Sequence, residues 1–422
     1  MRCGIDRKVL VLLMIAASGP AVFAQQAPST LPPGWVTPII PGIVQEPTLL
    51  KKFINATDNT IGGDPQDGPY VEWGNMITGS GWISAGPGYR HHVLDGRAVI
   101  DASAAVSWNI YKTYQAAIEF PHLDRDRLSL GGQVMYQDLM AVEYFGLGND
   151  SSVSNQSAYR FNNLDILSFA RLRPTPWLSV DGRFGWIPRP DLSTATGPKV
   201  HYPNTVDLFT EATAPGIHTQ PTFLHGDISV AADTRDHAGH PTIGGLYRAG
   251  AAIYSDRDAG TYSFRRYEVE AAQFVPLFTR QWVLALHGWG VFSDTSNGEV
   301  VPFYLMPSLG GKNTLRGYHD YRFHDTDMET FSAESRWALF THVDAAVFAD
   351  AGKVAPRAGD LGLHHLKSSY GLGLRLHNTT TNLVRLDVGH SPEGWRLYLK
   401  VSDPFKRSTP ASGRTAVVPF VP

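Results

Sequence analysis

Four segments alternate apolar and polar residues one by one, and this pattern constrains the fold of the chain more than any other feature. They are 127–137, 223–233, 383–389 and 395–402. Successive side chains of a β-strand point to opposite sides, so a period of two gives each strand one apolar and one polar face. The sequence sustains no helical apolar period, and beyond the N-terminus no apolar run approaches the roughly 20 residues of a transmembrane helix. We therefore expect an all-β protein.

Strands of this kind suit two architectures. In a soluble sandwich the apolar faces form a core, whereas in a transmembrane barrel they meet lipid and the polar faces line the lumen. Charges of both signs on the polar faces, such as Arg385 and Asp387, and short turns alternating with long loops favour the barrel. Aromatic residues near strand ends suggest interfacial girdles. They are Trp73, Trp82, Trp108, Tyr144, Phe145, Trp177, Trp186, Trp282 and Trp395.

Counting strands back from the C-terminus predicts an antiparallel transmembrane β-barrel of sixteen strands. The expected strands are 68–77, 81–93, 97–108, 111–121, 127–145, 157–173, 176–188, 221–233, 243–255, 260–275, 280–293, 329–340, 342–352, 366–377, 380–390 and 394–405. With both ends periplasmic, the long loops at 146–156, 189–220, 294–328 and 353–365 all fall on the outside. This consistent placement supports the count, because outer-membrane barrels have short periplasmic turns and long external loops.

The segments before and after the predicted barrel lack its alternating strands. Residues 1–24 have the basic start, short apolar run and small-residue cleavage site of a secretory signal. The Pro-rich and turn-rich residues 25–67 are expected to form an extended periplasmic segment with one short helical stretch. The barrel is assigned to 68–405, and the tail at 406–422 is expected to be disordered.

Composition and motifs exclude several kinds of site. The only cysteine, Cys3, lies in the signal, so the mature chain is expected to contain no disulfide and no cysteine nucleophile or ligand. The net charge of −3 and the lack of a basic stripe argue against nucleic acid as a partner. Nucleophile elbows, phosphate loops and dinucleotide fingerprints are missing, so no enzyme activity and no cofactor are expected. No metal site is expected at the histidine clusters, which are His91 with His92, His237 with His240, and His364 with His365.

Residues 310–318, with the sequence GGKNTLRGY, form the most distinctive loop of the chain. The pair Gly310 and Gly311 lets the backbone turn without the steric penalty of a Cβ atom. Arg316 then stands just before Gly317 and Tyr318. On these residues alone, Arg316 is either a solvated surface side chain or a charge that the loop places at a particular point.

Four motifs resemble the BamA/TamA superfamily of outer-membrane barrels, also called the bacterial surface antigen family. GGKNTLRGY resembles the family's GG…(V/L)RG(F/Y) signature on the sixth extracellular loop. FADAG at 348–352 resembles the F-x-D-x-G of a later strand, and AESR at 333–336 resembles the acidic strand after the loop. YGLGLR at 370–375 and RLD at 385–387 resemble the penultimate strands. The resemblance covers 68–405.

The resemblance implies that the long loop folds back into the lumen and that its arginine pairs with acids on the barrel wall. Arg316 would pair with Asp350 and also with Glu334, because a guanidinium offers a planar fork for carboxylates. The loop latch would consist of Gly310, Gly311, Arg316, Gly317 and Tyr318.

Two departures from the family pattern concern the ends of the chain. The strand-terminal aromatic would be Phe405, although the chain continues to Pro422. Residues 25–67 are too few for one of the periplasmic POTRA domains of family members that insert or export proteins. The chain thus resembles the short subgroup without these domains.

The implied function is that of an integral protein of the bacterial outer membrane that inserts or translocates proteins or lipids through its lumen or lateral seam. The expected partners are outer-membrane lipid and unfolded outer-membrane or secreted proteins, and the chain is expected to be a monomer. Two alternatives stay open. One is a passive pore, which needs an open lumen. The other is a barrel lipid hydrolase, for which Ser229 and His225 share the polar face instead of the lipid face.

Overall fold

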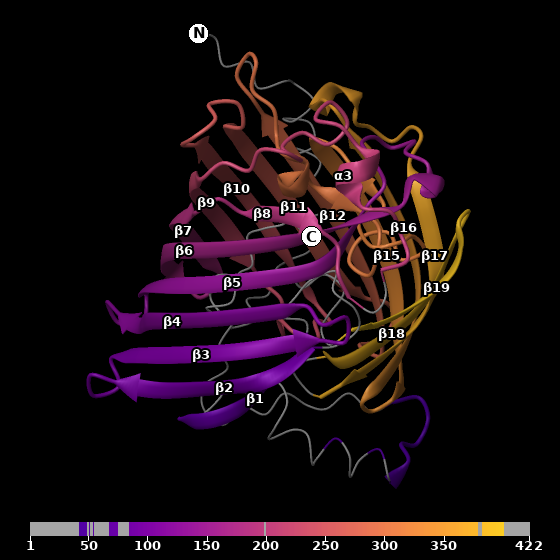
Figure 1. Cartoon of the computed structure of the whole chain (residues 1–422). Helices are drawn as coiled ribbons and strands as arrows, with labels where there is room; N and C mark the ends of the chain where they lie inside the picture. Colours follow the sequence, from indigo (N-terminus) through magenta and orange to yellow (C-terminus); the bar gives the residue numbers. More distant parts are fainter. Residues whose placement is uncertain are drawn as a thin grey trace.

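A computed structural model describes residues 42–48, 50, 54, 67–74, 84–197, 200–378 and 382–400. The expected signal at 1–24, Phe405 and the tail at 406–422 lie outside the described residues. The described chain forms one large, strongly curved antiparallel sheet of 17 strands, with loops gathered at one end (Figure 1). The prediction of an all-β protein is confirmed. No helix among the described residues is long and apolar enough to cross a membrane.

The strands follow one another around the sheet nearly in chain order. In the first half they are β1 (Gly68–Gly74), β2 (Ser84–Val93), β3 (Ala98–Ser107), β4 (Lys112–Leu123), β5 (Leu128–Tyr144), β6 (Ser157–Thr175), β7 (Leu178–Ile187) and β8 (Asp191–Thr194). In the second half they are β9 (Phe223–Asp233), β10 (Gly244–Asp256), β11 (Phe264–Pro276), β12 (Trp282–Asp294), β15 (Asp327–Phe340), β16 (Val343–Ala355), β17 (Lys367–His377), β18 (Asn382–Ser391) and β19 (Gly394–Lys400).

Short elements lie in the loops that the sequence predicted as irregular. The strand β8 pairs with the far part of β6, so β7 pairs directly with β9. In the long connection from β12 to β15, β13 (Ser308–Leu309) and β14 (Phe323–His324) form a separate two-stranded ladder. The remaining short elements are α3 (Thr205–Leu208), η1 (Val153–Asn155), η2 (Phe303–Leu305) and η3 (Ala358–Asp360).

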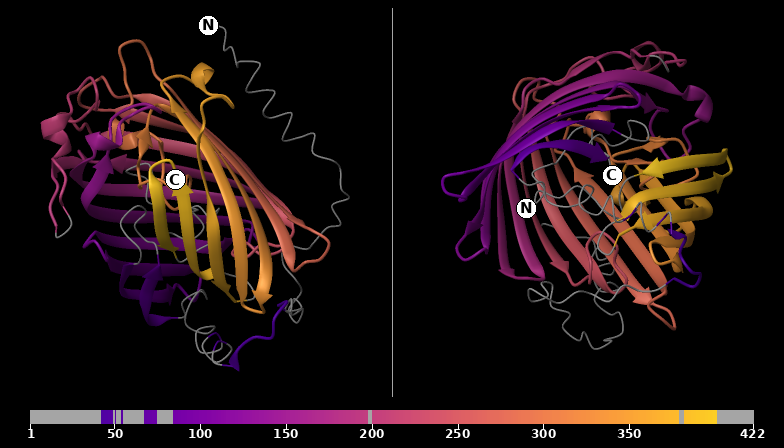
Figure 2. Two further views of the ribbon diagram at one scale, coloured as in Figure 1. Left: turned by 90° about the vertical axis from the view of Figure 1, so that its right-hand side faces the viewer. Right: turned by 90° about the horizontal axis from the view of Figure 1, so that it is seen from below.

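The strands β1 and β19 form the two edges of the sheet. The strand β1 pairs with β2, and β19 pairs with β18. No ladder joins the described residues of β1 and β19. Figure 2 shows the curvature from the side and from below, with the indigo and yellow strands at separate edges.

The sheet buries its polar face and exposes its apolar face. On β5, Gln133 and Gln137 are 3% and 2% exposed, whereas Leu130 and Val134 are 39% and 42% exposed. The strands β9, β18 and β19 show the same inversion. A soluble sandwich would bury the apolar faces instead, so this burial pattern contradicts that alternative. A sheet whose outer surface is apolar suits lipid, where the polar side chains turn inward.

Two aromatic residues expected at an interfacial girdle are buried against the loops instead. Tyr144 and Phe145 are fully buried, and the ring centroid of Tyr144 lies 4.8 Å from that of Phe303 and 4.9 Å from that of Phe209. With 17 residues, β5 exceeds the roughly 9–11 residues that cross a bilayer, so its end extends into the loops and packs beneath them. The girdle prediction is wrong for these two residues.

Of the tryptophans predicted to lie in the girdle, five have side chains that the structure describes. Trp108, Trp177, Trp186, Trp282 and Trp395 are exposed. Trp82 and the side chain of Trp73 lie outside the described residues.

Candidate functional site

The loop between β12 and β15 is an ordered structure that packs against the polar face of the sheet. The β13–β14 ladder closes its base, and the left-handed backbone of Gly310 (φ 116°) and Gly311 (φ 85°) turns the chain. Leu315 and Tyr318 are almost fully buried in a cluster with Trp289, Val291, Leu309, Phe323, Met328 and Val354. Apolar packing therefore orients the segment that carries Arg316.

Arg316 lies within hydrogen-bonding distance of both acids that the sequence associated with it. Its Nε and Nη2 donate to the two carboxylate oxygens of Asp350 at 2.9 and 2.8 Å, which is a bidentate pair. Its Nη1 donates to Oε2 of Glu334 at 2.6 Å. Its guanidinium carbon also lies 3.6 Å from the ring centroid of Phe348, a cation–π contact. All these groups are buried.

Three further charges complete the network, and the sequence did not identify them as partners of Arg316. Arg375 donates to Glu334 at 2.7 Å and to Oδ1 of Asp387 at 2.6 Å. Arg385 forms an ion pair with Oδ2 of Asp387 at 3.0 Å. Alternation placed Arg385 and Asp387 on a polar face, and Arg375 lay within the motif at 370–375, but the meeting of these residues depends on the register between strands, which no local pattern shows.

The buried network is electrically balanced, with three arginines and three carboxylates. Burial by itself lowers the pKa of Arg316, but the Asp350 and Glu334 carboxylates outweigh this effect and raise the pKa above its ordinary value. Arg316 therefore stays charged. Removal of any one member would leave an uncompensated charge in a dry environment.

One glycine on β18 and one in the loop allow the loop to approach the sheet closely. A Cβ atom on Gly389 would lie 1.3 Å from the carbonyl oxygen of Arg316. On the loop side, a Cβ atom on Gly317 would lie 2.8 Å from the backbone of His390 and from Ser369. The loop and β18 thus touch backbone to backbone, which only glycine permits.

The loop backbone is also bonded to the last two strands. Ser391 on β18 donates its hydroxyl to the Gly317 carbonyl at 2.7 Å, and Arg385 donates to the Lys312 carbonyl at 2.5 Å. On the edge strand β19, Tyr398 donates its hydroxyl to the Tyr318 carbonyl. The loop therefore connects β15 and β16 to the edge of the sheet that β19 forms.

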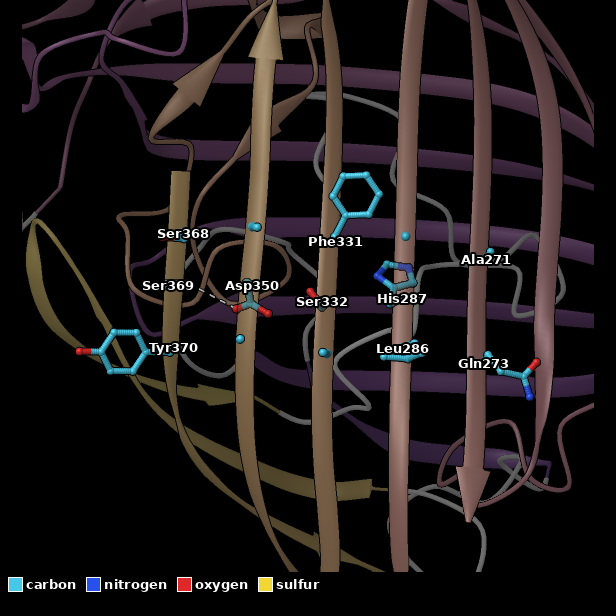
Figure 3. Close-up of a pocket in the computed structure, with 14 residues that line it drawn as sticks. Ala271, Gln273, Leu286, His287, Phe331, Ser332, Asp350, Ser368, Ser369 and Tyr370 are labelled. Carbon is cyan, nitrogen blue, oxygen red and sulfur yellow. Dashed lines mark hydrogen bonds between the residues drawn. The ribbon is translucent and has the colours of Figure 1, made fainter. Parts of the chain in front are cut away.

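A pocket of about 630 Å³ lies in the sheet wall beside Asp350. Figure 3 shows Asp350 and Ser369 joined across β16 and β17, with neighbouring lining residues from β11, β12 and β15. Small residues such as Ala333, Ala349 and Ala351 thin the wall at this level. The pocket is mainly a depression in the wall next to the buried network.

Comparisons with known proteins agree with this architecture. A family model described as "Omp85 superfamily domain" matches residues 96–391. The crystal structure of BamA from Haemophilus ducreyi lacking POTRA domains 1-3 is similar with 15% identity and a TM-score of 0.58, over 80% of this chain and 70% of that one. CdiB from Escherichia coli is similar with 11% identity and a TM-score of 0.51, over 81% of this chain and 63% of that one. At such identities the two structures show a shared fold, and this chain spans less than two thirds of the CdiB chain.

Proposed function

Because the chain belongs to the Omp85 superfamily, we propose that it is a bacterial outer-membrane β-barrel that inserts or translocates proteins through its lumen or lateral seam. The observation that carries this proposal is the buried Arg316 network, which ties one long loop to the polar face of the sheet. The exposed apolar face supports a membrane location. The substrate class is unfolded outer-membrane or secreted protein, with membrane lipid as the surroundings.

The sixteen long strands close into a barrel when β1 meets β19. Among the described residues each of these strands has a ladder on one side, and bilayer lipid cannot satisfy the backbone groups of an open edge. In the closed barrel, the loop around Arg316 lies inside the lumen and plugs it. A structural latch holds this loop and consists of Gly310, Gly311, Arg316, Gly317 and Tyr318. Its partners on the strands are Glu334 on β15 and Asp350 on β16.

The seam between β1 and β19 is the proposed route for substrate, so covalent closure is expected to stop the activity. Cysteine pairs placed along β1 and β19 are oxidised in turn, and insertion of a substrate barrel into proteoliposomes is measured before and after reduction. Because Cys3 is the only native cysteine, each new disulfide is unambiguous. We expect insertion to be lost on oxidation and restored on reduction.

A matched control is available within the last hairpin. Val388 and Leu397 are direct partners in the β18–β19 ladder, so a cysteine pair there bonds the same edge strand without crossing the seam. This variant should retain insertion in both redox states. Full insertion by a protein with a locked seam would reject lateral opening.

The latched loop is also expected to keep the barrel from conducting. In planar bilayers, the full chain should show little current, whereas a variant without residues 311–317 should show large, stable openings. Shortening the exposed segment around η3 (Ala358–Asp360) serves as the control and should leave conductance low. A full chain that conducts as well as the loop-deleted variant would instead indicate a passive pore.

A further inference from the structure

Three buried side chains converge at the end of the sheet opposite the Arg316 loop. His240 lies in the connection between β9 and β10, Asp344 is the second residue of β16, and His377 is the last residue of β17. One donor atom from each residue lies within 4.8 Å of the other two. These residues lie outside the Arg316 network and play no part in the proposed latch.

Both imidazole rings lie close to the same carboxylate. Nε2 of His240 lies 2.7 Å from Oδ2 of Asp344, and Nε2 of His377 lies 3.3 Å from Oδ1. The two rings stack with their centroids 3.7 Å apart and their planes 12° apart. The result is a compact set of two nitrogens and two oxygens with little access to water.

The hydrogen bonding of His377 leaves a position between its ring and Asp344 that a second proton or a metal ion can take. Its Nδ1 lies 2.7 Å from the carbonyl oxygen of Asn378, and a carbonyl can only accept, so Nδ1 carries the proton. A neutral His377 then points the lone pair of Nε2 at an oxygen of Asp344. Two acceptors face each other, an arrangement that either an added proton or a metal ion makes favourable.

We propose that His240, Asp344 and His377 bind a divalent transition-metal ion, and that zinc suits the site best. Two imidazole nitrogens and one carboxylate oxygen are ordinary zinc ligands and leave a fourth position open. The bond from His377 Nδ1 to a backbone carbonyl is the outer contact that typically orients a metal-binding histidine. Binding requires the stacked rings to tilt so that both Nε2 lone pairs converge on the ion.

The surrounding charges permit this binding. Arg336, a nearby positive charge, donates to the Pro241 carbonyl at 2.5 Å. The neighbouring His342 is occupied by Glu46, whose carboxylate lies 2.9 Å from its Nδ1.

A metal ion at this position would fasten one end of the molecule. Four strands, β10, β11, β12 and β15, separate β9 from β16 in the sheet. The connection at 234–243 joins β9 to β10, so it must extend past β11, β12 and β15 for His240 to meet Asp344. The ion would hold this connection in place across the end of the curved sheet.

The test uses the full chain refolded in detergent micelles and stripped of metal with a chelator. Zinc sulfate is titrated at neutral pH by calorimetry, and Co²⁺ is used as a spectroscopic substitute for zinc. We expect one saturable ion per chain and a visible Co²⁺ absorption band that zinc abolishes. Asp344→Asn and His240→Ala should each weaken binding by at least tenfold. His237→Ala, in the same connection, should bind as the unmodified chain does.

A stability measurement gives an independent readout. Ligand that binds only the folded state stabilises it in proportion to the logarithm of its concentration. Samples are heated in steps, and the band of the folded protein is followed by gel electrophoresis. The temperature at which this band disappears should rise with zinc for the unmodified chain and for His237→Ala, but not for Asp344→Asn.

Other outcomes overturn the proposal. Absence of saturable binding, or equal binding by His240→Ala, would show that a proton on His377 alone satisfies Asp344 or that zinc binds exposed histidines. If both variants fail to fold, the Co²⁺ band of the unmodified chain decides, and its absence rejects the metal site.

Discussion

Replacement of Arg316 by alanine is expected to destabilise the folded protein by roughly 3–5 kcal/mol, the cost of leaving a buried charge without its partner. Asp350 loses both side-chain hydrogen bonds from Arg316, and Glu334 retains only Arg375. The temperature at which the folded band disappears from a gel should fall, and a protease should cut the 310–318 loop. Both effects arise because the loop loses its charged attachment to β15 and β16.

Arg357→Ala is the matched control for this substitution. Its side chain is 85% exposed and forms an ion pair with Asp360 in the same loop, so its removal should leave stability unchanged. Arg316→Lys should lie between the two variants, since an ammonium group lacks the bidentate fork. Unchanged gel migration together with a protected loop in Arg316→Ala would refute the latch.

The second large effect is expected from Gly389→Ala, which adds one methyl group and removes no charge. The new Cβ atom would lie 1.3 Å from the Arg316 carbonyl oxygen, a position that backbone atoms cannot share. The loop must withdraw from β18, so Arg316 loses its alignment with Asp350. We expect protease cleavage of the loop and a loss of heat resistance comparable to that of Arg316→Ala.

A double-mutant comparison makes the mechanism specific. If Gly389→Ala acts by displacing the loop, combining it with Arg316→Ala should add much less destabilisation than the sum of the single changes. Gly182→Ala on β7 is the control, because the nearest atom to its Cβ is 3.8 Å away. Additive effects would mean that Gly389 and Arg316 act independently.

Strand positions could be predicted from the sequence because a period of two is a local property. Each expected range overlaps one long strand, and the inverted burial on β5 follows its alternation directly. The same pattern does not indicate where a strand leaves the membrane, so Tyr144 and Phe145 were assigned to a girdle although they pack beneath the loops. β8 was also missed, since it depends on the long extension of β6 for its partner.

The candidate site was less predictable because it depends on contacts between distant segments. The resemblance directed attention to Arg316, Asp350 and Glu334, which the structure brings together. Arg375 and Asp387 lay within recognised motifs, yet their role requires knowledge of the register of β17 and β18. His240 was noted only beside His237, because nothing local shows that its connection extends past three strands to Asp344.

The contacts of the loop also imply an order of steps in the folding of the chain. Arg316 meets Asp350 across 34 residues, Gly317 meets Ser391 across 74, and Tyr318 meets Tyr398 across 80, all toward the C-terminus, whereas Arg322 of the same loop meets Ser151 across 171 residues toward the N-terminus. A chain emerging from synthesis therefore carries residues 316–318 before these C-terminal partners exist. Loop closure over such separations is slow and entropically costly, so docking belongs to the last stage of folding. The loop can then dock fully only after β18 and β19 have formed.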